Sequence, residues 1–151
     1  MVKIYVDGGN STKNKVGGCA AIVTKDNVII AEVVETYTGA QVTNNTMELG
    51  GAILACQYML DHPELGKDVT IVADSRYVVD GSSLWLPRWK LNGWKSKTGS
   101  VKNKELWEAI DYLKTQLNIT WQWTAGHDTC ALNNRADELL VAAYRKLIKK
   151  K

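Results

Sequence analysis

Four acidic residues that lie far apart in the chain occupy positions from which they could hold metal ions together. Asp7 ends an alternating apolar segment, and Asp74 ends a short apolar run. Glu48 lies in the first turn of a predicted helix, and Asp137 lies near the start of another. In open α/β sheets, strand ends converge on one crevice where the topology changes. Clustered carboxylates repel one another, and the hard cations Mg²⁺ or Mn²⁺ would relieve that repulsion. Two such cations, about 3.5–4 Å apart, would suit phosphoryl transfer.

Each acid also has a purely structural interpretation. Asp7, which two glycines follow, could end a strand in a turn, and Asp74 could cap the next helix. Glu48 could complete a capping box that begins at Asn45, and Asp137 could complement a helix dipole. Taken one at a time, these residues do not decide between structure and chemistry.

Apolar periodicity predicts five strands and four helices around these acids. Strands are expected at residues 2–7, 19–23, 28–34, 69–73 and 119–124, with a tight turn at 25–27 between the second and third. Helical stripes cover residues 49–60, 106–117 and 136–147, and a shorter helix over 75–80 is expected to stop at Gly81. This order predicts one mixed sheet with helices packed on its faces, in a single α/β domain.

Composition excludes several classes of protein. The chain has 151 residues, of which 45% are hydrophobic and 23% charged, which disfavours disorder, collagen and coiled coil. Its longest apolar run, residues 139–144, is far shorter than the roughly 20 residues of a membrane-spanning helix. Its first residues cannot form a secretory segment, so we expect a cytoplasmic protein without membrane contact. The three cysteines show no paired spacing and predict neither a disulfide framework nor a zinc site.

Basic residues are concentrated in residues 81–104, which contain no acid, although the net charge of the whole chain is only +3. Trp85, Trp89 and Trp94 alternate with these basic residues. A charge run is usually a solvated face and tryptophans are usually core, but this mixture favours a surface that binds a polyanion. The other three tryptophans, on helix and strand stripes, are assigned to the core: Trp107, Trp121 and Trp123.

Taken together, the motifs resemble those of type-one ribonuclease H. The resemblance runs from about residue 2 to residue 148, in the order of the family. It rests on the following segments: IYVDGG (4–9), TNNTMEL (43–49), ADSRYV (73–78), GH (126–127), NNRADEL (133–139), and the basic WLPRWKLNGWK (85–95) with VKN (101–103).

The resemblance implies a ribonuclease H-like fold, a five-stranded mixed sheet of an antiparallel meander and parallel strands, flanked by helices. Residues 1–151 would form one catalytic domain, with residues 81–104 as its basic handle. The implied activity is endonucleolytic hydrolysis of the RNA strand of RNA/DNA hybrids, leaving 5′-phosphate and 3′-hydroxyl ends. By similarity, Asp7, Glu48, Asp74 and Asp137 would ligate two Mg²⁺ ions, or Mn²⁺ in their place. His127 would assist proton transfer or product release.

The same resemblance assigns contacts with the hybrid, and we expect the enzyme to act as a monomer. Recognition would depend on the shape of the duplex, since an A-form-like hybrid presents 2′-hydroxyls in a wide minor groove. The implied substrate-binding residues are Gly8, Gly9, Asn10, Thr43, Asn44, Asn45, Arg76, Trp85, Lys90, Lys95, Lys97 and Asn103. Thr43 and Asn103 match a pocket for a DNA phosphate. Arg76 stands where many relatives have glutamine, and Gln41 where some have arginine.

Two other functions remain open from the sequence. Integrases and resolvases share this architecture and act on DNA, but the basic handle and the His127 loop argue against them. A binding module without catalysis would explain the basic segment. It would gain nothing from clustered carboxylates, because its ligand is an anion.

Overall fold

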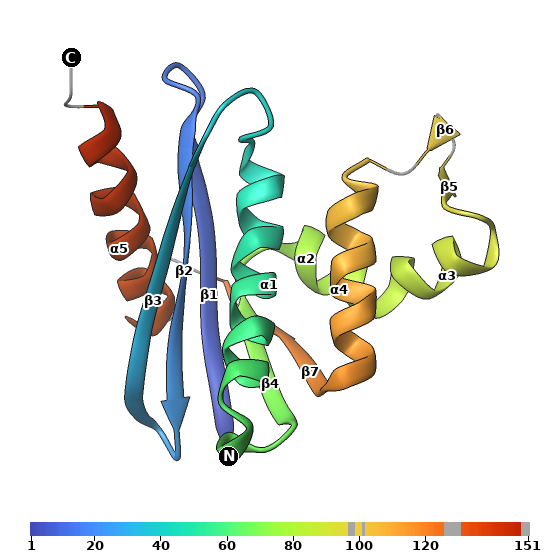
Figure 1. The fold of residues 1–151 in the computed structure, drawn as a ribbon, viewed down its shortest axis with the longest axis horizontal. Helices are drawn as coiled ribbons and strands as arrows, with labels where there is room; N and C mark the ends of the chain where they lie inside the picture. The colour runs from blue at the N-terminus through green and yellow to red at the C-terminus, as the bar shows by residue number, and fades with distance from the viewer. Residues whose placement is uncertain (97–98, 101, 126–130, 149–151) are drawn as a thin grey trace.

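A five-stranded mixed sheet forms the centre of the computed structural model, which describes residues 1–96, 99–100, 102–125 and 131–148 (Figure 1). The strand order is β3-β2-β1-β4-β7. The first three strands pair antiparallel, whereas β4 and β7 run parallel to β1. The predicted mixed sheet is therefore confirmed. Its strands are β1 (Val2–Ser11), β2 (Val16–Lys25), β3 (Val28–Thr38), β4 (Asp68–Ala73) and β7 (Asn118–Trp123).

The meander is longer than its apolar pattern indicates. Asp26 and Asn27 adopt left-handed backbone, with φ of 52° and 68°, and form the predicted turn. The prediction that β1 stops at Asp7 is wrong, because Gly8 and Gly9 pair with β2 and extend the ladder to Ser11. Likewise, β2 starts at Val16 and β3 continues to Thr38, since these two residues pair with each other. Long-range pairing, which the local sequence does not show, sets these strand lengths.

Helices cover both faces of the sheet. One face packs α1 against Ile4, Val6 and Ile71, and the other packs α5 against Ala20 and Ile22. In Figure 1, α1 and α5 lie on opposite sides of β1 and β2. The helical elements are α1 (Asn44–Asp61), the 3-10 turn η1 (Pro63–Leu65), α2 (Arg76–Asp80), the π-helical turn η2 (Gly81–Trp85), α3 (Leu86–Leu91), α4 (Lys104–Gln116) and α5 (Ala131–Ile148).

Helix α1 begins earlier than predicted, because a different pair of residues forms its capping box. Thr43 is the N-cap, and its hydroxyl accepts from the Thr46 amide at 3.1 Å. The Thr46 hydroxyl in turn accepts from the Thr43 amide at 2.8 Å. The predicted box between Asn45 and Glu48 is therefore wrong, because Thr46 already fills the reciprocal position. The Glu48 carboxylate is consequently available for another role.

The basic segment is a folded extension whose aromatic residues are largely structural. The predicted stop at Gly81 is wrong, since Gly81 is helical and α2 continues through η2 into α3. The rings of Trp85, Trp89 and Trp94 contact one another in sequence, with centroids 6.0 and 6.3 Å apart. Trp89 also meets the buried Trp107 at 5.4 Å. Two short strands, β5 (Lys95–Ser96) and β6 (Gly99–Ser100), follow as an antiparallel pair.

The tertiary contacts explain the glycine at position 81. A Cβ atom there would overlap the ring of Trp107, which is fully buried. The handle therefore packs closely against α4 because position 81 has no side chain. Within the described residues, no helix combines the length and the apolar composition that a membrane crossing requires.

We expect Gly81→Ala to destabilise the protein by about 1–3 kcal/mol, because overpacking of the Trp107 ring outweighs the higher helix propensity of alanine. Ser82→Ala is the matched control. The Ser82 hydroxyl is buried and no described residue hydrogen-bonds to it, so its removal is expected to be neutral or stabilising. Urea unfolding of both variants measures the difference. Equal stability of Gly81→Ala and the wild type would contradict the packing argument.

Candidate active site

Three carboxylates converge at the end of the parallel part of the sheet. Asp7 and Asp74 each follow directly after the last parallel pair, Val6 with Ala73. Glu48 comes from the start of α1, which lies over β1. One oxygen of each of the three carboxylates lies within 4.8 Å of the others. The predicted convergence of these three acids is therefore present in the structure.

Gly8 brings the helix to the strand. A Cβ atom at this position would collide with the backbone of Met47 and Glu48. The Gly8 amide donates to Asp7 Oδ1 at 2.9 Å and to Glu48 Oε1 at 2.6 Å. One backbone N–H thus holds two carboxylates in place. The alternative that Gly8 and Gly9 form a turn after Asp7 is wrong, because both glycines lie within β1.

The structural alternatives for Glu48 and Asp74 also fail. Thr43 and Thr46 cap α1 without Glu48. Ser75, not Asp74, caps α2, since its hydroxyl accepts from the Val78 amide at 3.2 Å. The buried Oδ1 atom of Asp74 has no hydrogen-bond partner among the described residues. These carboxylates are therefore not used for helix capping.

Burial and the charges of neighbouring acids favour the neutral forms of Asp7 and Glu48. Asp7 is only 3% exposed, and burial raises its pKa, with further increases from Glu48 and Asp74. Burial and the charge of Asp74 likewise raise the pKa of Glu48, although the Gly8 amide opposes this rise. In the described part of the chain, none of the three forms an ion pair with a basic side chain. A hard divalent cation fits this donor set, because it would neutralise the charge and satisfy the unpartnered Asp74 oxygen.

Asp137 lies at the edge of this cluster. It contributes to the raised pKa of Asp7, but it is not among the three acids whose oxygens lie within 4.8 Å of one another. Helix α5 is already formed at Ala131, so the expectation that Asp137 lies near a helix start is wrong. The dipole effect is confined to the first turn and does not account for this acid. His127 lies outside the described residues.

Asn133, which the sequence analysis did not single out, connects α5 to the cluster. Its Nδ2 donates to the Val6 carbonyl at 3.0 Å, one residue before Asp7. Asn133 precedes Asp137 by one helical turn, so this bond orients the helix that carries Asp137. Asn133 lies in the same NNRADEL segment as Asp137, and this proximity in sequence could have marked it as a residue of the site.

Trp123 was assigned to the core, and this prediction is wrong. The side chain is 39% exposed, whereas Trp107 is fully buried and Trp121 is half-buried. The Trp123 indole donates to the Asp74 carbonyl at 3.1 Å. The guanidinium carbon of Arg76 lies 4.0 Å from the centroid of the Trp123 ring. The alternation in β7 indicated that Trp123 lies on the same face of the sheet as Trp121. It did not show that the residues packed on this face leave Trp123 exposed.

The predicted substrate-binding residues fall into two groups. One group adjoins the carboxylates along the chain: Gly8, Gly9 and Asn10 in β1, Thr43, Asn44 and Asn45 at the start of α1, and Arg76 at the start of α2. The other group belongs to the handle side: Trp85 in η2, Lys90 in α3, Lys95 in β5, and Asn103 before α4. Lys90 is 3.3 Å from Asp111, and the Asn103 amide donates to the Tyr77 hydroxyl at 3.1 Å. Lys97 lies outside the described residues.

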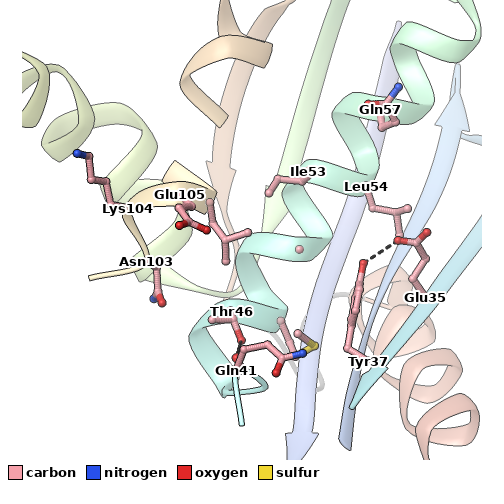
Figure 2. Close-up of a pocket in the computed structure, with 13 residues that line it drawn as sticks. Glu35, Tyr37, Gln41, Thr46, Ile53, Leu54, Gln57, Asn103, Lys104 and Glu105 are labelled. Carbon is pink, nitrogen blue, oxygen red and sulfur yellow. Dashed lines mark hydrogen bonds between the residues drawn. The ribbon is translucent and has the colours of Figure 1, made fainter. Parts of the chain in front are cut away.

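An open groove of about 800 Å³ runs across the outer face of α1. Figure 2 shows Asn103 on one side of this helix and Tyr37 with Glu35 on the other. Gln41 and Thr46 line the groove near the start of α1, and none of the clustered carboxylates reaches it. The groove therefore lies apart from the candidate metal site.

Comparison with known proteins identifies the family. The RNase H family model matches residues 1–145. The ribonuclease H of Francisella philomiragia subsp. philomiragia is 38% identical over 146 residues, covering 95% of this chain and 90% of the relative. LC9-RNase H1, a type 1 RNase H with the type 2 active-site motif, is 30% identical with a TM-score of 0.80, over 96% of this chain and 72% of that one. LC11-RNase H1, solved in complex with RNA/DNA hybrid, is 22% identical and shares the fold at a TM-score of 0.73, over 99% of this chain and 100% of that one. The chain therefore belongs to the ribonuclease H family of nucleases.

Proposed function

We propose that this nuclease hydrolyses the RNA strand of RNA/DNA hybrids at a site that holds two Mg²⁺ ions. The observation that carries the proposal is the cluster of the buried Asp7 and Glu48 with the half-buried Asp74. One oxygen of each lies within 4.8 Å of the others, and none has a basic partner among the described residues. Its relatives are named ribonuclease H, and LC11-RNase H1 binds a hybrid. Asp137 would complete the ligand set from α5.

The side chains prepare the site for in-line displacement at a phosphate. When bound, two cations would supply an activated water and stabilise the leaving 3′ oxygen, which gives 5′-phosphate and 3′-hydroxyl ends. The Gly8 amide keeps the Asp7 and Glu48 carboxylates at a fixed separation before substrate arrives. His127 would accept or deliver a proton beside this anionic centre. One chain supplies all four carboxylates, so we expect a monomer to be active.

Contacts on both sides of the carboxylates would select the hybrid. Gly8, Gly9, Asn10, Asn44, Asn45 and Arg76 lie within a few residues of a proposed ligand and would meet the minor groove. Thr43 and Asn103 would hold a DNA phosphate, and Trp85 would lie against the DNA sugars. Lys90, Lys95 and Lys97 would contact further phosphates. These lysines would add affinity without reading base sequence.

A hybrid with a labelled RNA strand tests the activity directly. We expect Mg²⁺-dependent cleavage of that strand, inhibition by EDTA, and no cleavage of duplex DNA. Equal cleavage of duplex DNA would instead support the integrase-like alternative. Binding without cleavage would support the binding module.

Asp74→Asn is expected to lower kcat by about 100-fold or more, because the loss of one ligand charge weakens a metal site that supplies several kcal/mol. The fold should remain, since the substitution opens no cavity. Asp68→Asn, at the other end of the same strand, is the matched control, and its activity should equal that of the wild type. Wild-type turnover by Asp74→Asn would refute the assignment of Asp74 as a ligand.

Asp7→Asn is expected to stabilise the metal-free protein at pH 8, raising the midpoint of thermal unfolding by about 3–8 °C. The ordinary pKa values of Asp7 and Glu48 are 3.8 and 4.5, and folding raises both. Ionisation therefore opposes folding increasingly as the pH rises above about 4. The gain should fade as the pH falls below about 3, where both acids are mostly protonated in either state, and it should shrink in Mg²⁺. Calorimetric unfolding scans in EDTA measure it, and a gain independent of pH would contradict the electrostatic cause.

Lys95→Ala is expected to weaken hybrid binding and to lower the slope of log K against log salt by about one, since one phosphate contact is lost. Fluorescence anisotropy with the Asp74→Asn background measures binding without turnover. Lys25→Ala, at the β2–β3 turn, serves as the control. An unchanged salt slope for Lys95→Ala would remove this residue from the proposed binding surface.

A further inference from the structure

We infer that Trp123 is a positioning residue with two separate tasks beside the carboxylates. Its indole N–H fixes the backbone of Asp74, and its ring fixes the direction of the Arg76 side chain. The inference rests on the proposed function, since it assigns the indole a role at that same site. The strand pattern predicts Trp123 to be a core residue, and neither task follows from that prediction.

The first task concerns the end of β4. The ladder between β4 and β7 ends at Ala73 paired with Trp123. Two further hydrogen bonds extend the connection beyond this pair, from the Thr124 amide to the Ala73 carbonyl at 3.0 Å and from the Trp123 indole to the Asp74 carbonyl at 3.1 Å. The side-chain bond thus reaches one residue farther than the backbone pairing. It holds the peptide from which the Asp74 carboxylate projects.

The Asp74 carboxylate depends on this peptide for its position. Its Oδ1 atom is buried and has no hydrogen-bond partner in the part of the chain that the structure describes. The nearby Asp7 and Glu48 carboxylates repel its ionised form. A loosened peptide would therefore let the carboxylate move away from its neighbours. Groups that hydrogen-bond to a ligating side chain typically change metal affinity by about 10–100-fold. The Trp123 bond reaches the Asp74 backbone instead, so we expect a smaller effect.

The second task concerns Arg76, the first residue of α2. Its guanidinium carbon lies 4.0 Å from the centre of the Trp123 ring, within the roughly 6 Å range of a cation–π contact. Arg76 is exposed and forms no ion pair with a carboxylate in the described part of the chain. Its N–H donors therefore remain available to a nucleic-acid strand. Stacking on the ring reduces the side-chain freedom that would otherwise be lost on binding.

Trp123→Phe separates the two tasks, because phenylalanine keeps a ring face but lacks the N–H donor. Isothermal titration calorimetry of the protein with Mg²⁺ alone should show binding weakened by about 3–10-fold. The KM for the hybrid at saturating Mg²⁺ should stay within about 2-fold of the wild type, since a ring still supports Arg76.

Trp123→Leu removes both the donor and the ring. It should weaken Mg²⁺ binding as Trp123→Phe does and also raise the KM for the hybrid by about 3–10-fold, the effect expected of Arg76→Gln. The double variant Trp123→Leu/Arg76→Gln should raise KM no further than Arg76→Gln alone, because both changes remove one contact.

Trp121→Phe is the matched control, on the same strand and with the same substitution. The Trp121 indole N–H is buried and has no hydrogen-bond partner within the described residues, so Mg²⁺ binding should stay at the wild-type value. Unchanged Mg²⁺ binding by Trp123→Phe, or equal weakening by Trp121→Phe, would overturn the first task. Additive KM effects in the double variant would overturn the second. A wild type that fails to cleave hybrids would refute the proposed function, while the Mg²⁺ titrations would still decide the first task.

Discussion

Repulsion among three carboxylates held within 4.8 Å of one another is the constraint on which the rest of the structure depends. Each of them reaches this point from a separate element: β1, α1 and the end of β4. Without a cation, this arrangement costs free energy, and the packing of the surrounding elements must offset that cost. They do so through the parallel pairing of β1 with β4 and the packing of α1 onto the sheet.

A single glycine makes this arrangement possible. Gly8 allows the start of α1 to approach β1, and its amide binds the carboxylates of Asp7 and Glu48. A residue with a side chain would separate strand and helix and would disturb both carboxylates. Gly8 thus meets a packing requirement, because it has no side chain, and an electrostatic one, through its backbone N–H. The close carboxylates that favour metal binding therefore lower the stability of the metal-free protein.

Much of the fold could be predicted because it depends on local chemistry. Asp26 and Asn27 tolerate left-handed backbone and predict their turn, and the helical stripes predict the α1, α4 and α5 helices. The positions of the four acids, and the family motifs around them, indicated the site before any coordinates. For three of them the structure shows the convergence, because strand ends and helix starts meet at one edge of the sheet.

The remaining features depend on partners distant in sequence. Gly8 resembles a turn residue until β2 pairs with it, and Gly81 resembles a helix stop until Trp107 packs against it. Two capping boxes overlap in the TNNTMEL segment, and only the hydrogen bonds of Thr43 and Thr46 decide between them. The alternation of β7 places Trp123 on a face, but the end of the covering layer leaves it exposed beside Asp74.

The unbroken helical path from α2 through η2 to α3 also sets a length scale. It joins Arg76, beside the carboxylates, to Lys90 in the handle without an intervening loop. Fourteen residues at a rise of about 1.5 Å separate these two backbone positions by no more than about 21 Å, whatever the bend of the path. This span is shorter than one helical turn of a duplex, which is about 34 Å in B-form DNA. The proposed contacts of Arg76 and Lys90 would thus fall within one turn of the same hybrid. The helical backbone between them would fix the distance from the cleavage site to the phosphate contact in the handle.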